Sequence, residues 1–168
     1  TIQASNMKNT MQNIINACLA IIVTLLIYNV FELKEKVDNL DQVSNSSAID
    51  VVKSAYETFG NGDMEGWKKL HSEDLTFTVL GNIATTGVHV GPDNVIKDVF
   101  NVIPGTWPNF SIVHKEIYSD GDNVFVHSDM TADNLKTETM HMFKVKNGII
   151  TSFIAFDDTG SMADAAKK

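Results

Sequence analysis

The sequence contains no arginine, because all 13 basic residues among its 168 are lysines. Arginine is the side chain best suited to bidentate contacts with phosphate groups. The 21 acidic residues outnumber the lysines and give a net charge of -8, which repels a polyanion. We therefore expect no nucleic-acid partner.

Cysteine is nearly absent as well, since Cys18 is the only one in the chain. A single thiol excludes an internal disulfide and a cysteine-rich metal site. The five histidines fall at neither HxxxH nor HxH spacing, so the sequence supports no other metal site. We expect neither a metal nor another cofactor.

Charged residues are missing from residues 14–31, and residues 17–28 read ACLAIIVTLLIY, which only Thr24 interrupts. A run of about 18 to 20 apolar residues is long enough to cross a bilayer of ~30 Å as a helix. The pattern predicts a polar tail at residues 1–12 and a single membrane-spanning helix at residues 13–33, with lipid as its partner. The alternative is a cleaved signal peptide, for which the run is long and no small-residue cleavage site follows promptly.

The lysines that flank this segment say little about its orientation. Lys8 on one side nearly balances Lys34 and Lys36 on the other under the positive-inside rule. Single-span proteins with a short amino-terminal tail often project the large domain outward. We therefore expect the domain on the outer or periplasmic side.

Residues 34–47 predict a helical stalk followed by a linker. Val30, Leu33, Val37 and Leu40 have the a/d spacing of a coiled coil, with charged residues around them. Fewer than two heptads are too few to specify an oligomer. The alternative is an amphipathic helix that rests on a partner or on the domain.

Residues 48–158 alternate helical and strand patterns and predict one domain. Ser47 and Asp50 resemble a capping box that starts the first helix. The periodicity predicts helices at residues 48–60, 64–70 and 92–103, the last ended by Pro104-Gly105, and strands at residues 75–80, 86–90, 110–118, 124–132 and a pair within 139–158. This order predicts an α+β fold in which a curved antiparallel sheet wraps around three helices. Residues 159–168 predict a flexible tail.

The strand pair within residues 139–158 turns at Asn147-Gly148 and carries two ionisable groups on apolar faces. Alternation places His141 beside Phe143 on one strand, and Asp157 beside Phe153 and Ala155 on the other. Such a pair is either the wall of a small-molecule pocket or a core with two satisfied polar groups.

Several short motifs in this order carry a family resemblance. They are Tyr56-Glu57-Thr58-Phe59, Gly62-Asp63, residues 73–77 (EDLTF), residues 87–92 (GVHVGP), Asp122-Asn123-Val124, residues 146–150 (KNGII) and Phe156-Asp157. Residues 49–158 resemble the SnoaL-like branch of the nuclear-transport-factor-2-like superfamily, which also contains ketosteroid isomerase and scytalone dehydratase. The resemblance implies a cone-shaped, cystatin-like roll with a deep apolar pocket between the concave sheet face and the helices.

The resemblance also implies which residues line that pocket and where partners bind. The expected lining residues are Tyr56, Trp67, Phe77, Val79, Phe100, Phe143, Phe153 and Ala155. Family members often dimerise through the convex sheet face, where Met140 and Met142 point, so we expect a homo- or hetero-oligomer through that face.

The candidate catalytic pair is His141 with Asp157, because SnoaL-type cyclases place a histidine and an aspartate at these strand positions. The first-strand base of ketosteroid isomerase falls at Val79 here, and Tyr56 is one residue out of register with the isomerase tyrosine. In the alternative reading, Asp157 lies at a solvated rim, closing the strand or capping a tail amide, while His141 is hydrogen-bonded in the core.

Other histidines rank lower as site residues. We expect His71 to begin a solvated turn and His127 to face away from the pocket, and the facing of His114 is open.

Two functions therefore remain. The favoured one is a membrane-anchored, noncatalytic module that binds a small apolar ligand or another subunit, as an accessory component of a membrane complex. It is favoured because of the apolar segment, Val79 and the apolar convex face. The other is a SnoaL-type acid–base enzyme, a cyclase, isomerase or dehydratase, that acts on a hydrophobic carbonyl compound through His141 and Asp157.

Overall fold

A computed structural model describes the backbone of residues 2–167, and all of their side chains except those of residues 2–10, 13, 14, 18 and 39–47. The chain divides into two compact units, Thr1–Gln42 and Val43–Lys168, which we describe separately. The elements are α1 (Ile2–Gly60), α2 (Met64–Lys69), β1 (His71–Val79), β2 (Gly87–Val90), α3 (Pro92–Val95), the π-helix η1 (Ile96–Phe100), α4 (Ile103–Thr106), β3 (Ser111–Asp120), β4 (Asn123–Ala132), β5 (Leu135–Lys146), β6 (Ile149–Asp157) and α5 (Thr159–Ala165).

The first unit is helical throughout its described residues. It contains the segment Ile15–Asp38, whose 24 residues are long and apolar enough to cross a membrane. At 1.5 Å per residue this segment measures about 36 Å, against ~30 Å of hydrocarbon. The prediction of an apolar helix near the amino terminus is confirmed, and its insertion into a membrane stays a prediction.

The predicted linker and new helix start near Ser47 are not present, because α1 continues through residues 42–47 to Gly60. Serine and asparagine lower helix propensity by only about 0.5 kcal/mol each relative to alanine. No proline or glycine interrupts the segment, so nothing in it forces the helix to end.

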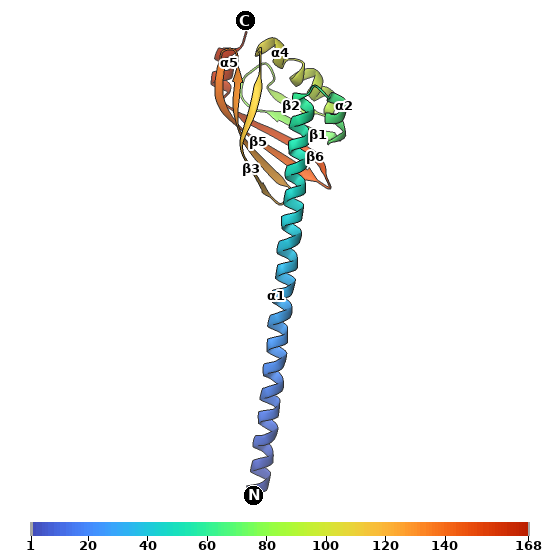
Figure 1. The fold of residues 1–168 in the computed structure, drawn as a ribbon, viewed down its shortest axis with the longest axis vertical. Coiled ribbons are helices and arrows are strands. Elements are labelled where there is room, and N and C mark those ends of the chain that lie inside the picture. Colours follow the sequence, from blue (N-terminus) through green and yellow to red (C-terminus); the bar gives the residue numbers. More distant parts are fainter. Residues whose placement is uncertain (1, 168) are drawn as a thin grey trace. The chain divides into compact units, whose positions relative to one another are not determined.

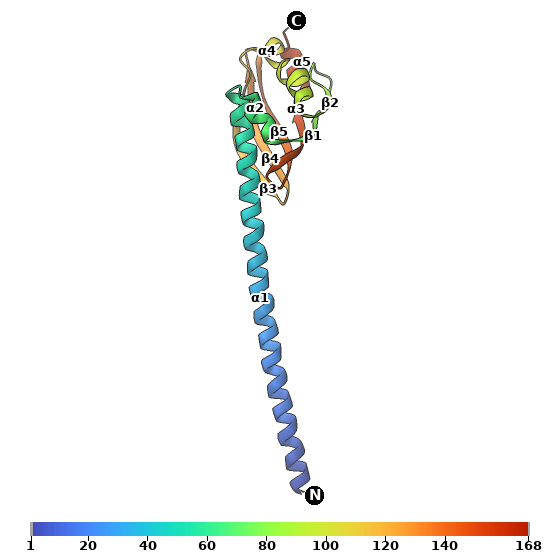
Figure 2. The same cartoon turned by 90° about the vertical axis from the view of Figure 1, so that its right-hand side faces the viewer.

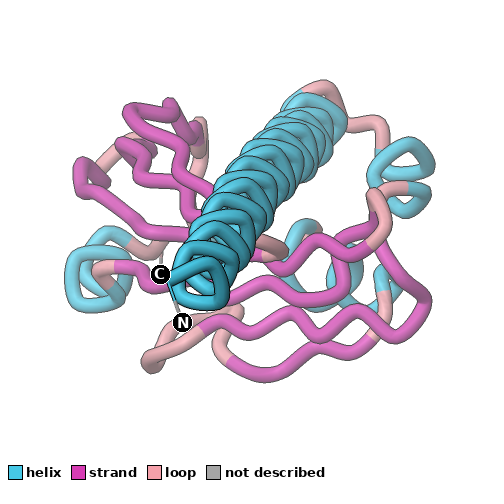
Figure 3. The backbone as a smooth tube through the Cα atoms, turned by 90° about the horizontal axis from the view of Figure 1, so that it is seen from below, coloured by secondary structure: helices cyan, strands magenta, loops and turns pink. Residues whose placement is uncertain are grey.

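The second unit is an α+β fold built on a six-stranded sheet in the order β2-β1-β6-β5-β4-β3. Its strands are long and strongly twisted, and the sheet bends rather than lying flat (Figures 1 and 3). The predicted antiparallel arrangement is correct except between β1 and β6, which pair in parallel. Three short helices and four strands separate β1 from β6 in the chain, so no hairpin forces them to run in opposite directions.

The turn between β5 and β6 matches its prediction. Asn147 and Gly148 have φ angles of 51° and 77°, the left-handed region that a two-residue hairpin requires at both positions. In β3, the register shifts between His114 and Glu116. This bulge turns Lys115 and Glu116 both outward, and it keeps His114 and Ile117 on the inner face.

The core lies between the concave sheet face and the helices. Its fully buried members come from α1, β1, α3, β4 and β6: Val52, Leu75, Val95, Val124, Val126 and Ile150. The segments α2 and α3 lie beside β1 at one end of the sheet (Figure 2). The helices thus close one side of the concave face.

Two predicted boundaries are wrong. The helix predicted at residues 92–103 is divided into α3, η1 and α4, and Pro104 lies within α4 instead of ending a helix. Proline suits the first turn of α4, where its missing N–H is not needed. The predicted flexible tail instead forms α5, because the Asp158 side chain accepts a hydrogen bond from the Ser161 amide and because Met162 is buried.

Candidate functional site

A cavity of about 90 Å³ lies between the concave sheet face and the helices. This volume is roughly six times the ~15 Å³ that a single water molecule needs, so a small organic molecule fits it. All eight predicted pocket residues line it, namely Tyr56, Trp67, Phe77, Val79, Phe100, Phe143, Phe153 and Ala155. His141 and Asp157 line it as well, so the structure brings all ten predicted site residues together.

The cavity walls are mostly aromatic and aliphatic, and the aromatic rings pack on one another. Phe77 and Phe153 stack with ring centroids 4.0 Å apart, and Phe143 meets Phe153 edge-on at 4.9 Å. Val79 lines the cavity from β1 with an apolar side chain.

A chain of polar contacts crosses one wall of the cavity, from α1 to β5 and β6. The Tyr56 hydroxyl lies 2.7 Å from Nδ1 of His141. On the other side of the ring, Nε2 of His141 lies 3.5 Å from Oδ1 of Asp157. The hydroxyl of Thr139, which pairs with Asp157 across the strands, donates a hydrogen bond to the same carboxylate. These contacts link a phenol, an imidazole and a carboxylate in series.

The predicted solvated rim position for Asp157 is wrong. Its side chain is only 7% exposed, the same as that of His141. The capping of the tail amide is performed by the next residue, Asp158. Asp157 itself faces inward and lines the cavity.

The hydrogen-bonding directions follow from the tautomer of His141. With its proton on Nε2, which lies 3.5 Å from a carboxylate oxygen of Asp157, the ring can pair with that carboxylate. In the neutral ring, Nδ1 is then the acceptor and the Tyr56 hydroxyl donates to it. In the protonated ring, Nδ1–H donates to the Tyr56 oxygen, and the phenolic proton is released toward other acceptors.

Tyr56 is held as a neutral phenol. Burial, together with the negative charge of Asp157, raises the pKa of Tyr56 far above its usual value of 10. The tyrosine predicted to be out of register therefore reaches His141 and stays a hydrogen-bond donor at physiological pH. Its hydroxyl ends the series of polar contacts that starts at Asp157, and all three side chains line the cavity.

His71 is the clearest correction among the histidines. It does not begin a solvated turn: it is 7% exposed at the start of β1 and lines the cavity. Its ring stacks on Trp67 with centroids 3.7 Å apart, and Nδ1 lies 2.7 Å from the Trp67 carbonyl oxygen. Burial lowers the pKa of His71 to about 4, so the ring is neutral at pH 7. The spacing of Trp67 and His71, four residues apart, was the available signal.

His114 and His127 lie on opposite faces of the sheet. The β3 bulge turns His114 inward, where its ring meets Tyr56 edge-on with centroids 4.1 Å apart and its Nδ1 lies 3.0 Å from the Ser128 hydroxyl. Burial, and then proximity to His141, lower the pKa of His114. His127 faces away from the cavity, as predicted, and contacts Glu138 on the outer face.

Trp107 and Met162 are among the cavity residues that the sequence analysis did not name. Trp107 is 1% exposed, and its indole N–H donates to the carbonyl oxygen of Met162 in α5. Met162 itself lines the cavity and is 4% exposed. The signal that could have found Met162 is the N-cap pattern of Asp158 and Ser161 ahead of an alanine-rich stretch.

Among the residues that the structure describes, no group of three His, Cys, Asp or Glu side chains could hold a metal ion. The polar side chains that line the cavity can exchange hydrogen bonds and protons with a bound molecule.

A protein-family model described as a SnoaL-like domain matches residues 52–153. No curated protein matches the chain. The matched residues run from the last turns of α1 to the middle of β6; they include Tyr56 and His141 but not Asp157.

Solved structures share the fold at low sequence identity. An NTF2-like protein of unknown function from Burkholderia pseudomallei K96243 has a TM-score of 0.66 and 21% identity, and the match covers 73% of this chain and 98% of that one. A protein described as a SnoaL-like polyketide cyclase from Jannaschia sp. CCS1 has a TM-score of 0.64, 15% identity and coverages of 73% and 92%. TerC, co-crystallized with polyporic acid, has a TM-score of 0.64, 19% identity and coverages of 71% and 97%.

Proposed function

This chain belongs to the SnoaL-like domain family, and we propose that its domain binds a small, largely apolar molecule that carries one hydrogen-bonding oxygen. The observation that carries the proposal is the 90 Å³ cavity, whose walls are apolar except for a few polar side chains that include Tyr56. An apolar cavity with a small number of oriented polar groups is the usual form of a ligand site. TerC, which shares the fold, was crystallized with polyporic acid.

The apolar segment of α1 tethers this domain to a membrane in our proposal. Its 24 residues support a single span, and an outward-facing domain is the orientation that we propose. A ligand that is mostly apolar partitions into lipid, so tethering raises its concentration near the cavity. An accessory role toward another subunit, through the convex face, stays a prediction.

Cyclohexanone and cyclohexane, two ring compounds of similar size that differ in polarity, test the binding proposal. The chain has two tryptophans, Trp67 and Trp107, and both line the cavity, so intrinsic fluorescence reports its occupancy. The full chain in mild detergent is titrated with cyclohexanone and with cyclohexane. We expect saturable binding of both, with the ketone tighter because its oxygen accepts a hydrogen bond from Tyr56 when that hydroxyl turns from His141 into the cavity.

Two variants provide the matched comparison. Tyr56→Phe is expected to weaken cyclohexanone about tenfold and leave cyclohexane unchanged, because one hydrogen bond is worth about 1.4 kcal/mol. Ala155→Leu fills the cavity and is expected to abolish both signals. Equal signals in Ala155→Leu and the parent chain would mean that the probes sit in the micelle, and would overturn the proposal.

Acid–base catalysis is a second candidate, favoured by the 2.7 Å contact between Tyr56 and His141. A proton on Nδ1 of His141 turns the Tyr56 hydroxyl toward a bound carbonyl oxygen. That oxygen accepts the phenolic hydrogen bond as it gains negative charge, and Asp157 stabilises the imidazolium. The Asp157 carboxylate, which also lines the cavity, takes the proton from the carbon next to the carbonyl and later returns it, so the site promotes enolisation of a ketone.

Deuterium exchange separates the enzyme from the binding module. The full chain is incubated with cyclohexanone in D₂O, and loss of the protons next to the carbonyl is followed by NMR. An enzyme exchanges them well above the buffer rate, and His141→Ala removes the excess while the far-UV circular dichroism is retained. Binding without excess exchange would leave the noncatalytic module as the function.

A further inference from the structure

Because α1 is continuous, one heptad register runs from its apolar segment into the charged segment that follows. Residues 30–40 alone contain less than two heptads. Extended back along the same helix, the register gives valine at every a position and leucine at every d position: Val23, Val30 and Val37 at a, and Leu19, Leu26, Leu33 and Leu40 at d. The pattern therefore covers three heptads.

The residue types at these positions favour one kind of assembly. β-Branched residues at a with leucine at d select two parallel strands over three or four. The preceding a position is Asn16, and a polar residue at a single a position fixes the register of a parallel pair. Within a bilayer, an asparagine also forms hydrogen bonds between helices.

The described side chains of this stripe are exposed. Their exposed fractions are 54% for Leu19, 51% for Val23, 58% for Leu26, 65% for Val30, 61% for Leu33 and 54% for Val37. In the charged segment, where the helix leaves the apolar run, exposed valine and leucine on one stripe cost free energy that a second helix recovers.

The flanking positions are compatible with an in-register parallel pair. In such a pair a g residue faces the e residue five positions later on the other helix. The pairs are Ile15 with Ala20, Ile22 with Ile27, Asn29 with Lys34, and Lys36 with Asp41. The last pair is oppositely charged and none is like-charged. Lys36 also contacts Glu32 within its own helix, 2.9 Å away.

We propose that residues 19–40 of α1 pair with the same residues of a second copy of this chain, as a parallel, in-register, two-stranded coiled coil. In the apolar segment the helices associate through close packing of valine and leucine. In the charged segment they associate by burying the same stripe from water. The pairing is independent of the cavity and of any ligand.

Single cysteines test the geometry of this pair. In a Cys18→Ser background, which removes the only native thiol, cysteine replaces Val30, Leu33 or Val37 on the stripe. The controls replace Glu32, Glu35 or Asp38, which lie at c, f and b. The full chain is oxidised in excess mild detergent, and we expect disulfide-linked dimer to form about tenfold faster at stripe positions than at control positions.

Other outcomes would overturn the proposal. Equal rates at stripe and control positions would mean random collision, and a larger mass than a dimer by light scattering would exclude two strands. Crosslinking of the stripe to an unrelated protein in membranes would assign it another partner.

A charge substitution in α1 supplies a second test, which leaves the fold of the second unit unchanged. Val37→Lys is expected to shift the chain from dimer to monomer, while the matched Glu35→Lys at position f leaves the dimer unchanged. Near-ultraviolet circular dichroism from Trp67 and Trp107 shows whether the second unit remains folded. A Val37→Lys chain that stays dimeric would contradict the pairing.

Discussion

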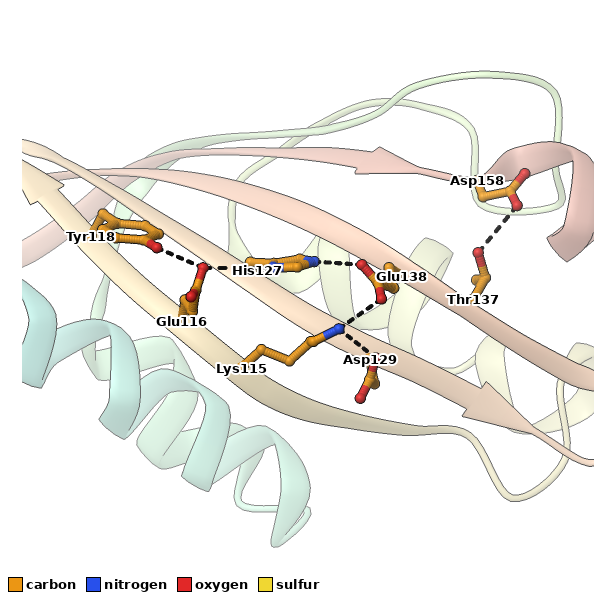
Figure 4. A network of polar contacts seen from close by, with 8 residues as sticks. All are labelled: Lys115, Glu116, Tyr118, His127, Asp129, Thr137, Glu138 and Asp158. Carbon is orange, nitrogen blue, oxygen red and sulfur yellow. Dashed lines mark hydrogen bonds and ion pairs between the residues drawn. The ribbon is translucent and has the colours of Figure 1, made fainter.

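Two sets of the same residue types lie on opposite faces of one sheet. The inner set joins Tyr56, His141 and Asp157. The outer set joins Tyr118, Glu116, His127, Glu138, Lys115 and Asp129 across β3, β4 and β5 (Figure 4). The contact distances are similar: His127 lies 2.7 Å from Glu138 in the outer set, and the Tyr56 hydroxyl lies 2.7 Å from His141 in the inner set. Burial differs: the side chains of His141 and Asp157 are each 7% exposed, whereas Glu138 is 55% exposed.

The comparison shows that solvent, and not residue type, distinguishes a site from a surface network. Exposed ion pairs are screened by water and salt and contribute little. The inner groups have lost their hydration, so each depends on the next for its hydrogen bonds. Only the inner set also lines a cavity, where a ligand can replace one of those partners.

The largest expected effect is that of removing the inner histidine. His141→Ala leaves the Tyr56 hydroxyl and the Asp157 carboxylate without their buried partner, and we expect a loss of about 4 kcal/mol in the free energy of unfolding. Urea denaturation measures it. The matched His127→Ala on the outer face should cost far less, and similar costs for the two variants would contradict the distinction between the faces.

The next effect is a pH dependence due to His71. Its pKa falls from 6.5 to about 4 on folding, so the unfolded chain takes up the proton first as the pH decreases. The free energy of unfolding is therefore highest above pH 6.5. It decreases by about 3 kcal/mol in total as the pH falls from 6.5 to 4.

Urea denaturation between pH 7 and pH 4 measures this loss. His71→Phe keeps an aromatic ring on Trp67 but has no proton to bind, so its stability should fall less steeply over that range. His127→Phe is the outer-face control and should keep the steep profile of the parent chain. An unchanged profile in His71→Phe would show that other groups cause the acid sensitivity.

A third, smaller effect comes from the wall that keeps the inner set dry. Met162→Ala enlarges the cavity next to Trp107 and should cost about 2 kcal/mol, while Met162→Leu nearly conserves volume and costs less. The alanine variant also admits water, so the inner set should become more like the outer one. If Met162→Ala and Met162→Leu had the same free energy of unfolding, α5 would not seal the cavity.

The smallest effect is expected on the outer face. Lys115 and His127 lower the pKa of Glu138 through hydrogen bonds, but the carboxylate is exposed to solvent. Glu138→Gln should therefore change the unfolding curve little, and 1 M NaCl should erase the difference because the Debye length is then about 3 Å. A large, salt-resistant loss would show that the outer set is as desolvated as the inner one.

The sequence predicted most of the fold because its signals are local. Strand alternation placed His141, Asp157 and the aromatic residues on one face, and Asn147-Gly148 fixed the hairpin. The register shift in β3 was not predictable, since no residue type marks it, and the facing of His114 depends on it. The burial of His71 and Asp157 depends on Trp67 and α5, which are contacts between elements and not a pattern along the chain.

The two outermost strands limit how this sheet can meet another molecule. β2 is only four residues long, and β3 carries the bulge at Lys115. An incoming strand needs a long, regular row of free backbone groups as its template, and short or bulged edge strands do not provide one. Strand-by-strand growth into a larger sheet, the first step of fibril formation, is thereby disfavoured at both ends.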